Sequence, residues 1–377
     1  MPDNSQNSKG NWAFLSSLLS RKVWGCQDVS EGVSCAKSGH ATGDQAVRHY
    51  VRSGIVSRLF FREENVAVST SANPRWPDLP FAAWRDTCDT LLLWTQIVGK
   101  VRIACTPLIN HWWNSTFAVT SRGLMAAAMA HRGRTFDVVF DFAEHELRIE
   151  ASDGRAEELA LEPMAVADFY AAFMERLRRL DIDVQIWTMP SEIENAIPFE
   201  QDRTHTQYDK EYVWRFWQAL VQANRVLNGF RMRFIGKASP VHFFWGSFDL
   251  VVTRFSGRTA PPPKSVTPNV APWVMAEAYS HEVSSCGFWP GNGGYGRAAF
   301  YVYAYPEPAG YGDMPLRAPA GFYDKDLGQF ILPYDAVRQA SDPDALLLGF
   351  LQETYEAAAE LGKWDRKALE RTTNKRV

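Results

Sequence analysis

The sequence has few cysteines, no long apolar run and no excess of positive charge. Its five cysteines are scattered over 377 residues without a C-x-x-C pair, so their spacing favours neither a zinc knuckle nor a disulfide framework. No stretch approaches the roughly 20 apolar residues of a membrane-spanning helix. The first ten residues are polar and lack the basic start and apolar core of a signal peptide. We therefore expect a cytoplasmic protein with reduced thiols and no membrane contact.

The charge balance and the aromatic content narrow the class of protein further. The chain carries 40 Lys and Arg against 43 Asp and Glu, a formal net charge of −3. A general nucleic-acid binder needs a basic face to neutralise phosphates, so we expect no nucleic-acid partner. Aromatic side chains make up 13% of the sequence and include 14 Trp. Because disordered chains are poor in aromatics, the composition indicates a folded protein of one large or two smaller domains.

Residues 1–75 differ in composition from the rest of the chain. They carry nine basic and six acidic residues and many Ser and Gly, without a sustained hydrophobic period. We interpret this segment as a poorly ordered N-terminal extension. The compact body is expected to begin at Trp76.

The body alternates helical and strand-like patterns in blocks, which is typical of an α+β protein. Apolar residues at helical spacing predict four helices, over 87–103, 164–180, 208–230 and 342–361. Short apolar runs between turn residues predict strands over 113–120, 136–142, 147–151, 157–161, 184–188, 243–255, 274–283 and 298–305.

Two short patterns recur in the same order in both halves of the body. His111 and His242 are each followed by two aromatic residues and, six positions on, by a phenylalanine. Asp141 and Glu277 each begin a run of an acid, three residues, a histidine, a glutamate and an aliphatic residue. Recurrence in the same order indicates an internal duplication.

We therefore predict two tandem repeats related by a pseudo-twofold axis, each an antiparallel sheet flanked by helices. The first covers residues 76–200 and the second residues 201–370, and together they form one compact body. Ligand sites often lie where two such units meet, because a cleft forms there.

A histidine and carboxylate set in the second half is the candidate metal site. Imidazole and carboxylate are ligands of zinc, iron and manganese. Glu277 and His281 are four residues apart, which places them on one face of a helix or a strand, and His242 lies on the preceding strand. We predict that these three residues hold a divalent transition metal. The alternative is a structural role, since a histidine between aromatics is often a core residue bonded to the backbone.

Without a metal, the same region could work by acid–base chemistry. His titrates near neutral pH and a neighbouring carboxylate can orient it, so His281 and Glu282 are the candidate catalytic residues. The candidate substrate-binding residues are Trp245, Arg254 and Trp289, because an arginine can hold a carboxylate or phosphate by a forked hydrogen-bond pair and the aromatics would line a cleft. The glycine-rich run 291–296 lacks the Lys-Ser/Thr of a phosphate-binding loop, so no nucleotide cofactor is expected.

Several of these runs resemble a known family. They share long, specific motifs and comprise residues 76–80, 93–100, 110–113, 242–249 and 277–282. They look like an uncharacterised bacterial family, the domain of unknown function 5996. The resemblance covers about Trp76 to Glu370 and implies that residues 1–75 lie outside the shared domain. It implies no particular activity.

Two functions from different classes follow from the sequence. The first is an enzyme that acts on a small molecule in an aromatic-lined cleft, with metal or acid–base chemistry. The alternative is a non-catalytic protein that binds a small molecule through its aromatics and arginines. A third and weaker reading is a structural partner protein that docks through its N-terminal extension.

Overall fold

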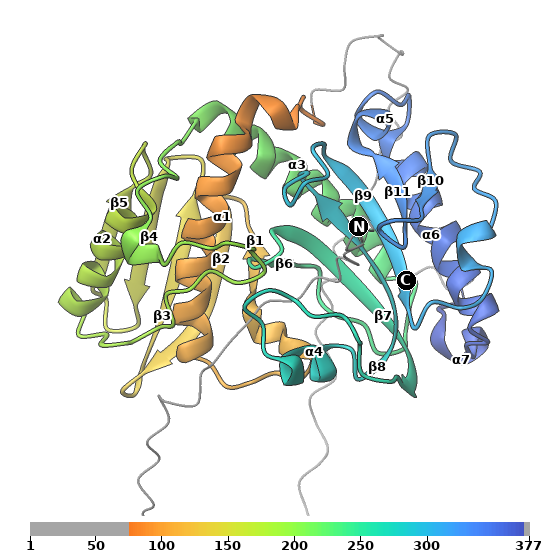
Figure 1. Ribbon diagram of the computed structural model, residues 1–377, viewed down its shortest axis with the longest axis horizontal. Helices are drawn as coiled ribbons and strands as arrows, with labels where there is room; N and C mark the ends of the chain where they lie inside the picture. The colour runs from red at the N-terminus through yellow and green to blue at the C-terminus, as the bar shows by residue number, and fades with distance from the viewer. Residues whose placement is uncertain (1–74, 373–377) are drawn as a thin grey trace, which may run out of the picture. The chain divides into compact units, whose positions relative to one another are not determined.

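The computed structural model describes residues 75–372 (Figure 1). The predicted extension, residues 1–75, therefore lies almost entirely outside the described residues. Residues 75–372 form an α+β fold, as predicted, in which helices pack on one antiparallel sheet of 11 strands.

The sheet consists of two meanders that meet at its centre, and the second ends irregularly because β11 lies between β9 and β10. Its strand order is β10-β11-β9-β8-β7-β6-β1-β2-β3-β4-β5, and all neighbours are antiparallel. The strands of the first half are β1 (Thr116–Val119), β2 (Gly123–His131), β3 (Arg134–Asp141), β4 (Glu146–Ala151) and β5 (Ala156–Ala160). Those of the second half are β6 (His242–Phe244), β7 (Asp249–Thr259), β8 (His281–Trp289), β9 (Ala299–Tyr305), β10 (Phe322–Asp324) and β11 (Gln329–Pro333).

Each meander is preceded and followed by a long helix. The helices of the described residues are α1 (Phe81–Ala104), α2 (Val166–Arg179), α3 (Lys210–Arg231), α4 (Pro272–Ala278), α5 (Tyr334–Arg338), α6 (Pro343–Leu361) and α7 (Arg366–Leu369). Three short 3₁₀ turns complete the set: η1 (Asn110–Ser115), η2 (Phe199–Gln201) and η3 (Tyr311–Asp313). Helix α1 is buried along most of its length and runs across the first half of the sheet in Figure 1.

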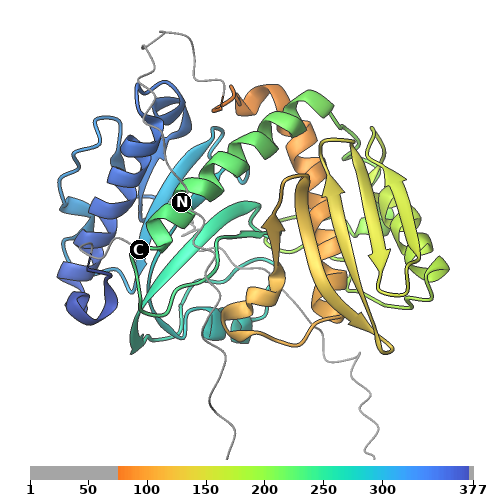
Figure 2. The same ribbon diagram turned by 180° about the vertical axis from the view of Figure 1, so that it is seen from behind.

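The helices of both halves pack on the same face of the sheet, as the pairing of the strands shows. Phe117 of β1 is paired with Phe243 of β6, so these two side chains share a face. On the first half, Phe117 packs on Phe140, which in turn packs on Phe169 of α2. On the second half, Phe243 packs on Phe216 of α3. The right-handed twist of the strands turns this face toward the viewer at β3 and away from the viewer at β7 in Figure 1, and the reverse holds in Figure 2.

The opposite face of the sheet differs between the two halves. On the first half it is open in Figure 2 and carries charged side chains such as Arg148 and Glu150. On the second half it carries the buried polar residues Asp249 and Tyr301. The second half therefore has buried polar residues beneath this face, and we refer to them as its polar layer.

The helix predictions and most strand predictions of the first half agree with the structure, as does the predicted strand 298–305, which is β9, but two other strand predictions of the second half differ. The predicted strand 243–255 is a hairpin, because the chain turns between β6 and β7 with Phe248 at a φ of +64°. The predicted strand 274–283 is helix α4 followed by the start of β8, and Pro272 occupies the first turn of that helix. No strand forms over 184–188, and the alanine-rich β2 was not predicted.

The recurring patterns that indicated a duplication do not lie at equivalent places in the two meanders. His111 lies in η1, ahead of β1, whereas His242 begins β6. Asp141 ends β3 and leads into the turn before β4, whereas Glu277 ends helix α4. These recurring sequence patterns alone therefore do not establish that the two halves are related by duplication.

Candidate functional site

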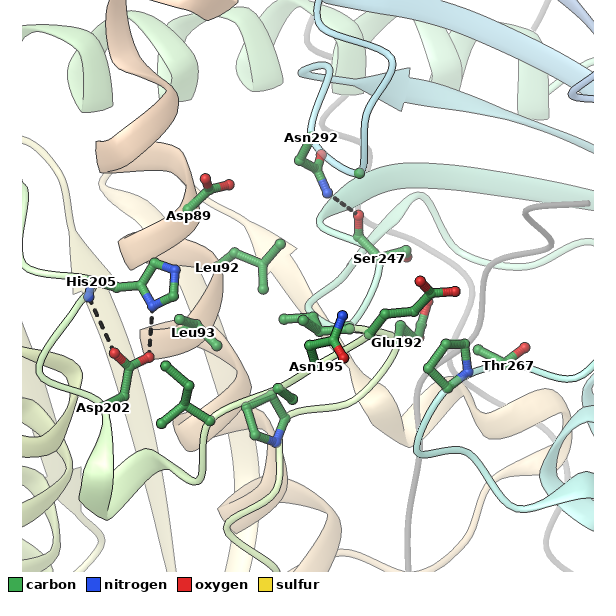
Figure 3. Close-up of a pocket in the computed structure, with 18 of the residues that line it drawn as sticks. Asp89, Leu92, Leu93, Glu192, Asn195, Asp202, His205, Ser247, Thr267 and Asn292 are labelled. Atoms are coloured by element: carbon green, nitrogen blue, oxygen red, sulfur yellow. Dashed lines mark hydrogen bonds and ion pairs between the residues drawn. The ribbon is translucent and has the colours of Figure 1, made fainter. Parts of the chain in front are cut away.

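A pocket of about 490 Å³ is lined by residues from both halves of the fold, which meet at the central β1–β6 pair (Figure 3). Its walls come from α1, from the irregular segment 190–205, from the turn between β6 and β7, from residues 266–268 and from the loop that follows β8. Gln96 holds the segment 190–205 on α1. Its side-chain amide donates to the carbonyl of Ser191 at 2.9 Å and accepts from the N–H of Ser191 at 2.8 Å.

One wall of the pocket presents a histidine oriented by a buried aspartate. His205 Nδ1 lies 2.7 Å from Asp202 Oδ2, and Asp202 is only 1% exposed. Because a carboxylate accepts at Nδ1, the neutral ring carries its proton there and leaves Nε2 as an acceptor. The dyad thus has the arrangement of a general base with an orienting carboxylate.

The backbone around this dyad is fixed by a turn and by helix α2. Asp202 Oδ1 accepts hydrogen bonds from the backbone N–H of Thr204 at 2.9 Å and of His205 at 3.1 Å. The carbonyls of Asp202 and His205 accept from the N–H groups of Ala167 and Val166 at the start of α2, at 3.0 and 3.1 Å. These bonds satisfy otherwise unpaired helix N-terminal donors and hold the imidazole at the pocket wall.

The opposite wall presents Glu192, labelled in Figure 3. Its Oε1 atom is buried and accepts no hydrogen bond from the described residues. Burial, and then the nearby Asp249, raise the pKa of this carboxyl to about 8, against the opposing effect of Lys100. Its backbone has a φ of +63°, an uncommon conformation for a non-glycine residue, and its N–H bonds the carbonyl of Pro268 at 2.9 Å.

A hydrogen-bonded chain connects the turn between β6 and β7 to the polar layer of the sheet. Asp249 is fully buried and accepts from the hydroxyls of Ser247 and Tyr301, and burial raises its pKa to about 6. The carbonyl of Ser247 accepts from Asn292 at 3.0 Å, and Asn292 in turn accepts from Trp289 Nε1 at 2.9 Å. Ser247, Asn292 and Trp289 all line the pocket, so this network gives that wall a fixed shape.

Lys100 lies behind the pocket wall, on the inner side of α1. It is fully buried, and its ammonium donates to Ser191 Oγ at 2.9 Å and lies 4.9 Å from the centre of the Trp187 ring. Burial lowers its pKa to about 7, while Glu192 opposes this shift. The site therefore combines two buried carboxyls and one buried amine whose protonation states depend on one another.

Of the three predicted substrate-binding residues, Trp289 lines the pocket and the other two do not. Trp245 is fully buried, with its ring against Gly99 of α1. Arg254 is 1% exposed, and its guanidinium lies over the rings of Phe230 and Tyr355 at 3.4 and 4.2 Å. Arg254 stands on the helix-covered face of β7, so α3 and α6 enclose it and keep it from a ligand.

The predicted metal ligands are not brought together. His242 is paired with Val251 of β7, whereas His281 is paired with Thr259. Eight residues of β7, with a bulge between Phe255 and Thr259, separate these two positions, so the two histidines lie at different levels of the sheet, and Glu277 ends helix α4. Within residues 75–372, no three His, Cys, Asp or Glu side chains form a group that could hold a metal.

The predicted catalytic residues His281 and Glu282 begin β8, outside the pocket. Glu282 accepts from Arg258 at 2.6 Å and from Ser256 at 2.8 Å. His281 lies 3.0 Å from Ser280 Oγ, and its ring centre lies 5.6 Å from that of His111. The structure thus places both in a half-exposed network next to η1 and α4.

Apart from Trp289, the sequence analysis did not select the residues that line the pocket. Asp202 and His205 are three apart just before a long helix, which is a spacing that allows a turn with the carboxylate on the imidazole. Glu192 lies in an irregular segment with no periodic pattern, so only the fold reveals its burial.

Glu192→Gln is expected to change how stability depends on pH. The raised pKa means that the folded chain holds a proton that the unfolded chain releases above about 4.5. The stabilising contribution of Glu192 is therefore present at low pH and is lost as pH rises toward about 8. Between about pH 5 and 9, we expect the melting temperature of the wild type to fall relative to that of Glu192→Gln. Exposed Glu162→Gln serves as control, and parallel curves for wild type and Glu192→Gln would contradict the prediction.

Residues 75–372 include no helix with the length and apolar character needed to span a membrane. Searches among curated proteins and among solved structures each found no match. One family model matches residues 76–371, and its description is a family of unknown function, DUF5996. The match spans nearly the whole described body and agrees with the resemblance seen in the sequence motifs. The chain belongs to this family of unknown function.

Proposed function

We propose that this protein is an enzyme that acts on a small molecule by general acid–base catalysis in the 490 Å³ pocket. His205, oriented by Asp202, is the general base, and Glu192 is the second group that exchanges a proton with the substrate. The observation that carries the proposal is that one pocket is lined by an aspartate-oriented imidazole and by a carboxyl whose buried Oε1 has no hydrogen-bond donor among the described residues.

The two groups are suited to complementary steps. With its Nδ1 proton bonded to Asp202, His205 can accept a proton at Nε2, and the carboxylate stabilises the imidazolium that forms. With a pKa of about 8, Glu192 is mostly protonated near neutral pH and can donate a proton to a bound molecule.

Turnover can be sought without knowing the substrate. Purified wild-type protein is incubated with a metabolite extract in deuterated water, and mass spectrometry follows compounds that change or gain deuterium. We expect at least one such compound with the wild type and with Glu162→Gln, and none with His205→Gln. Binding of a compound without conversion or exchange, equally in wild type and His205→Gln, would favour the alternative of a non-catalytic binding protein.

The proposal extends to the origin of the pocket, which we assign to the joint between two duplicated halves. Each half runs from a helix through an antiparallel meander to a second helix: α1, β1–β5 and α2, then α3, β6–β11 and α6. A pseudo-twofold axis perpendicular to the sheet at the β1–β6 pair would leave the helices of both halves on one face. The pairing of β1 with β6 places them on one face. We retain the cytoplasm as the proposed location, since the three cysteines among the described residues are free thiols.

A further inference from the structure

The ionisable groups that line the pocket are mostly acidic. Among the described lining residues, none is Lys or Arg and the basic residue is His205. The acidic ones are Asp89, Glu192, Glu194 and Asp202. Since Asp202 is bonded to His205, three carboxyl groups remain to interact with a bound molecule. Such a lining favours positive ligands and repels anions.

Glu192 provides a second and independent indication of the ligand. The Glu192 side chain is part-exposed and lines the pocket, while its Oε1 is buried and has no donor among the described residues. A carboxyl oxygen without a donor is a costly arrangement, which a cation bound at this side chain can relieve. Behind it, both oxygens of Asp249 are occupied by Ser247 and Tyr301. Lys100 on the same side donates to Ser191.

We propose that the pocket binds a small organic amine as its cation, with the ammonium against Glu192 and the apolar body against Trp289 and the leucines of α1. This inference rests on the proposed function, because it names the substrate class of the same pocket. Trp289 lines the wall and is held by Asn292 and stacked on Tyr295 at 5.0 Å. A fixed indole both packs on an apolar group and attracts a cation over its face. Leu92 and Leu93 supply the apolar surface opposite.

Binding of an amine should also change the protonation state of Glu192. The groups that act on Glu192 are Asp249, Lys100 and Tyr279. An ammonium beside the carboxyl stabilises its charged form, so Glu192 loses its proton when the complex forms. The same complex results if Glu192 donates its proton to the free base. Near neutral pH, where the free amine is already protonated, binding should therefore release a proton and strengthen as pH approaches about 8.

Three probes of one shape and different charge test the proposal on the full chain. They are benzylammonium, benzyl alcohol and benzoate, and isothermal titration calorimetry measures their binding. We expect benzylammonium to bind at least about tenfold more tightly than benzyl alcohol and benzoate to bind most weakly. Heats measured in two buffers of different ionisation enthalpy should show a proton released with benzylammonium.

Two matched variants locate the effect. Glu192→Gln should reduce the preference for benzylammonium over benzyl alcohol to about twofold or less and abolish the proton release. Glu194→Gln, which removes an exposed carboxylate of the same lining, should keep most of the preference. An unchanged preference in folded Glu192→Gln would overturn the assignment of Glu192.

The order of affinities of the three probes for the wild-type protein decides the charge of the preferred ligand, even if no variant folds. Benzoate or benzyl alcohol binding as tightly as benzylammonium would overturn the proposal, as would no benzylammonium binding up to about 10 mM. His205→Gln should leave the ranking intact while it removes turnover. If turnover is found and the ranking fails, the cation proposal alone is wrong; if the ranking holds and no turnover is found, the enzyme proposal alone is wrong.

Discussion

His205→Gln should lower kcat/KM for the substrate by about 10²- to 10⁴-fold, the range that a positioned general base contributes. Glutamine keeps a polar side chain of similar reach but has no nitrogen that can accept a proton. Since His205 is part-exposed at the pocket wall, the substitution opens no core cavity and should leave the melting temperature nearly unchanged. Steady-state kinetics and thermal unfolding together check this prediction.

Asp202→Asn should cost nearly as much activity for a different reason. The asparagine carbonyl can still accept from Thr204 and His205, as Oδ1 does now, so its amide NH₂ would face His205 Nδ1. The ring would then carry its proton on Nε2 and present a donor to the substrate where an acceptor is needed. Steady-state kinetics of Asp202→Asn beside the wild type check this prediction.

Two other histidine variants serve as matched controls. His145 pairs with Tyr208 through Nδ1 at 3.0 Å and does not line the pocket, so His145→Gln should retain activity. His281→Gln should retain it as well. Activity lost in His281→Gln but kept in His205→Gln would instead place the chemistry at the start of β8, where the sequence suggested it.

The fold could be predicted from the sequence where the hydrophobic period is uninterrupted. Helix α2, with Phe169 and Phe173 on its buried side, and helix α6, capped by Asp342, follow helical spacing closely. The sequence misled where one apolar run continues through a change of structure. The run around Trp245 and Phe248 is apolar on both sides of the turn between β6 and β7, so periodicity shows one strand where there are two.

The site was less predictable than the fold because it depends on burial that no local pattern shows. Trp289 was selected as an aromatic residue that would line a cleft, and it does line the pocket. Arg254 and His242 were selected for their chemistry, yet burial among aromatics encloses both. Burial lowers the pKa of His242 to about 3, so it stays neutral over the physiological range. Glu192 has its raised pKa only because residues distant in sequence, Asp249 among them, enclose it.

Gly99→Ala should destabilise the protein by about 1–3 kcal/mol, although alanine is the better helix former. Gly99 lies inside α1, where a Cβ atom would come within 2.2 Å of the Trp245 ring. That ring is fully buried, so it can make room for a methyl group only by displacing its neighbours. Trp245 also precedes Gly246 and Ser247 of the pocket wall, so a displaced ring should weaken binding of the benzylammonium probe as well as stability. Urea unfolding and probe titration measure the two effects.

Gly349→Ala is the matched control, because Gly349 lies inside α6 and a Cβ there meets no atom within 4 Å. It should stabilise the protein by about 0.5–1 kcal/mol through the lower backbone entropy of the unfolded chain. Combining Gly99→Ala with Trp245→Phe should recover part of the lost stability, since the smaller ring leaves room for the methyl group and the two sites are coupled. If both glycine variants were stabilised alike, the close contact of α1 with the turn between β6 and β7 would be wrong. The pocket wall built on that contact would be wrong with it.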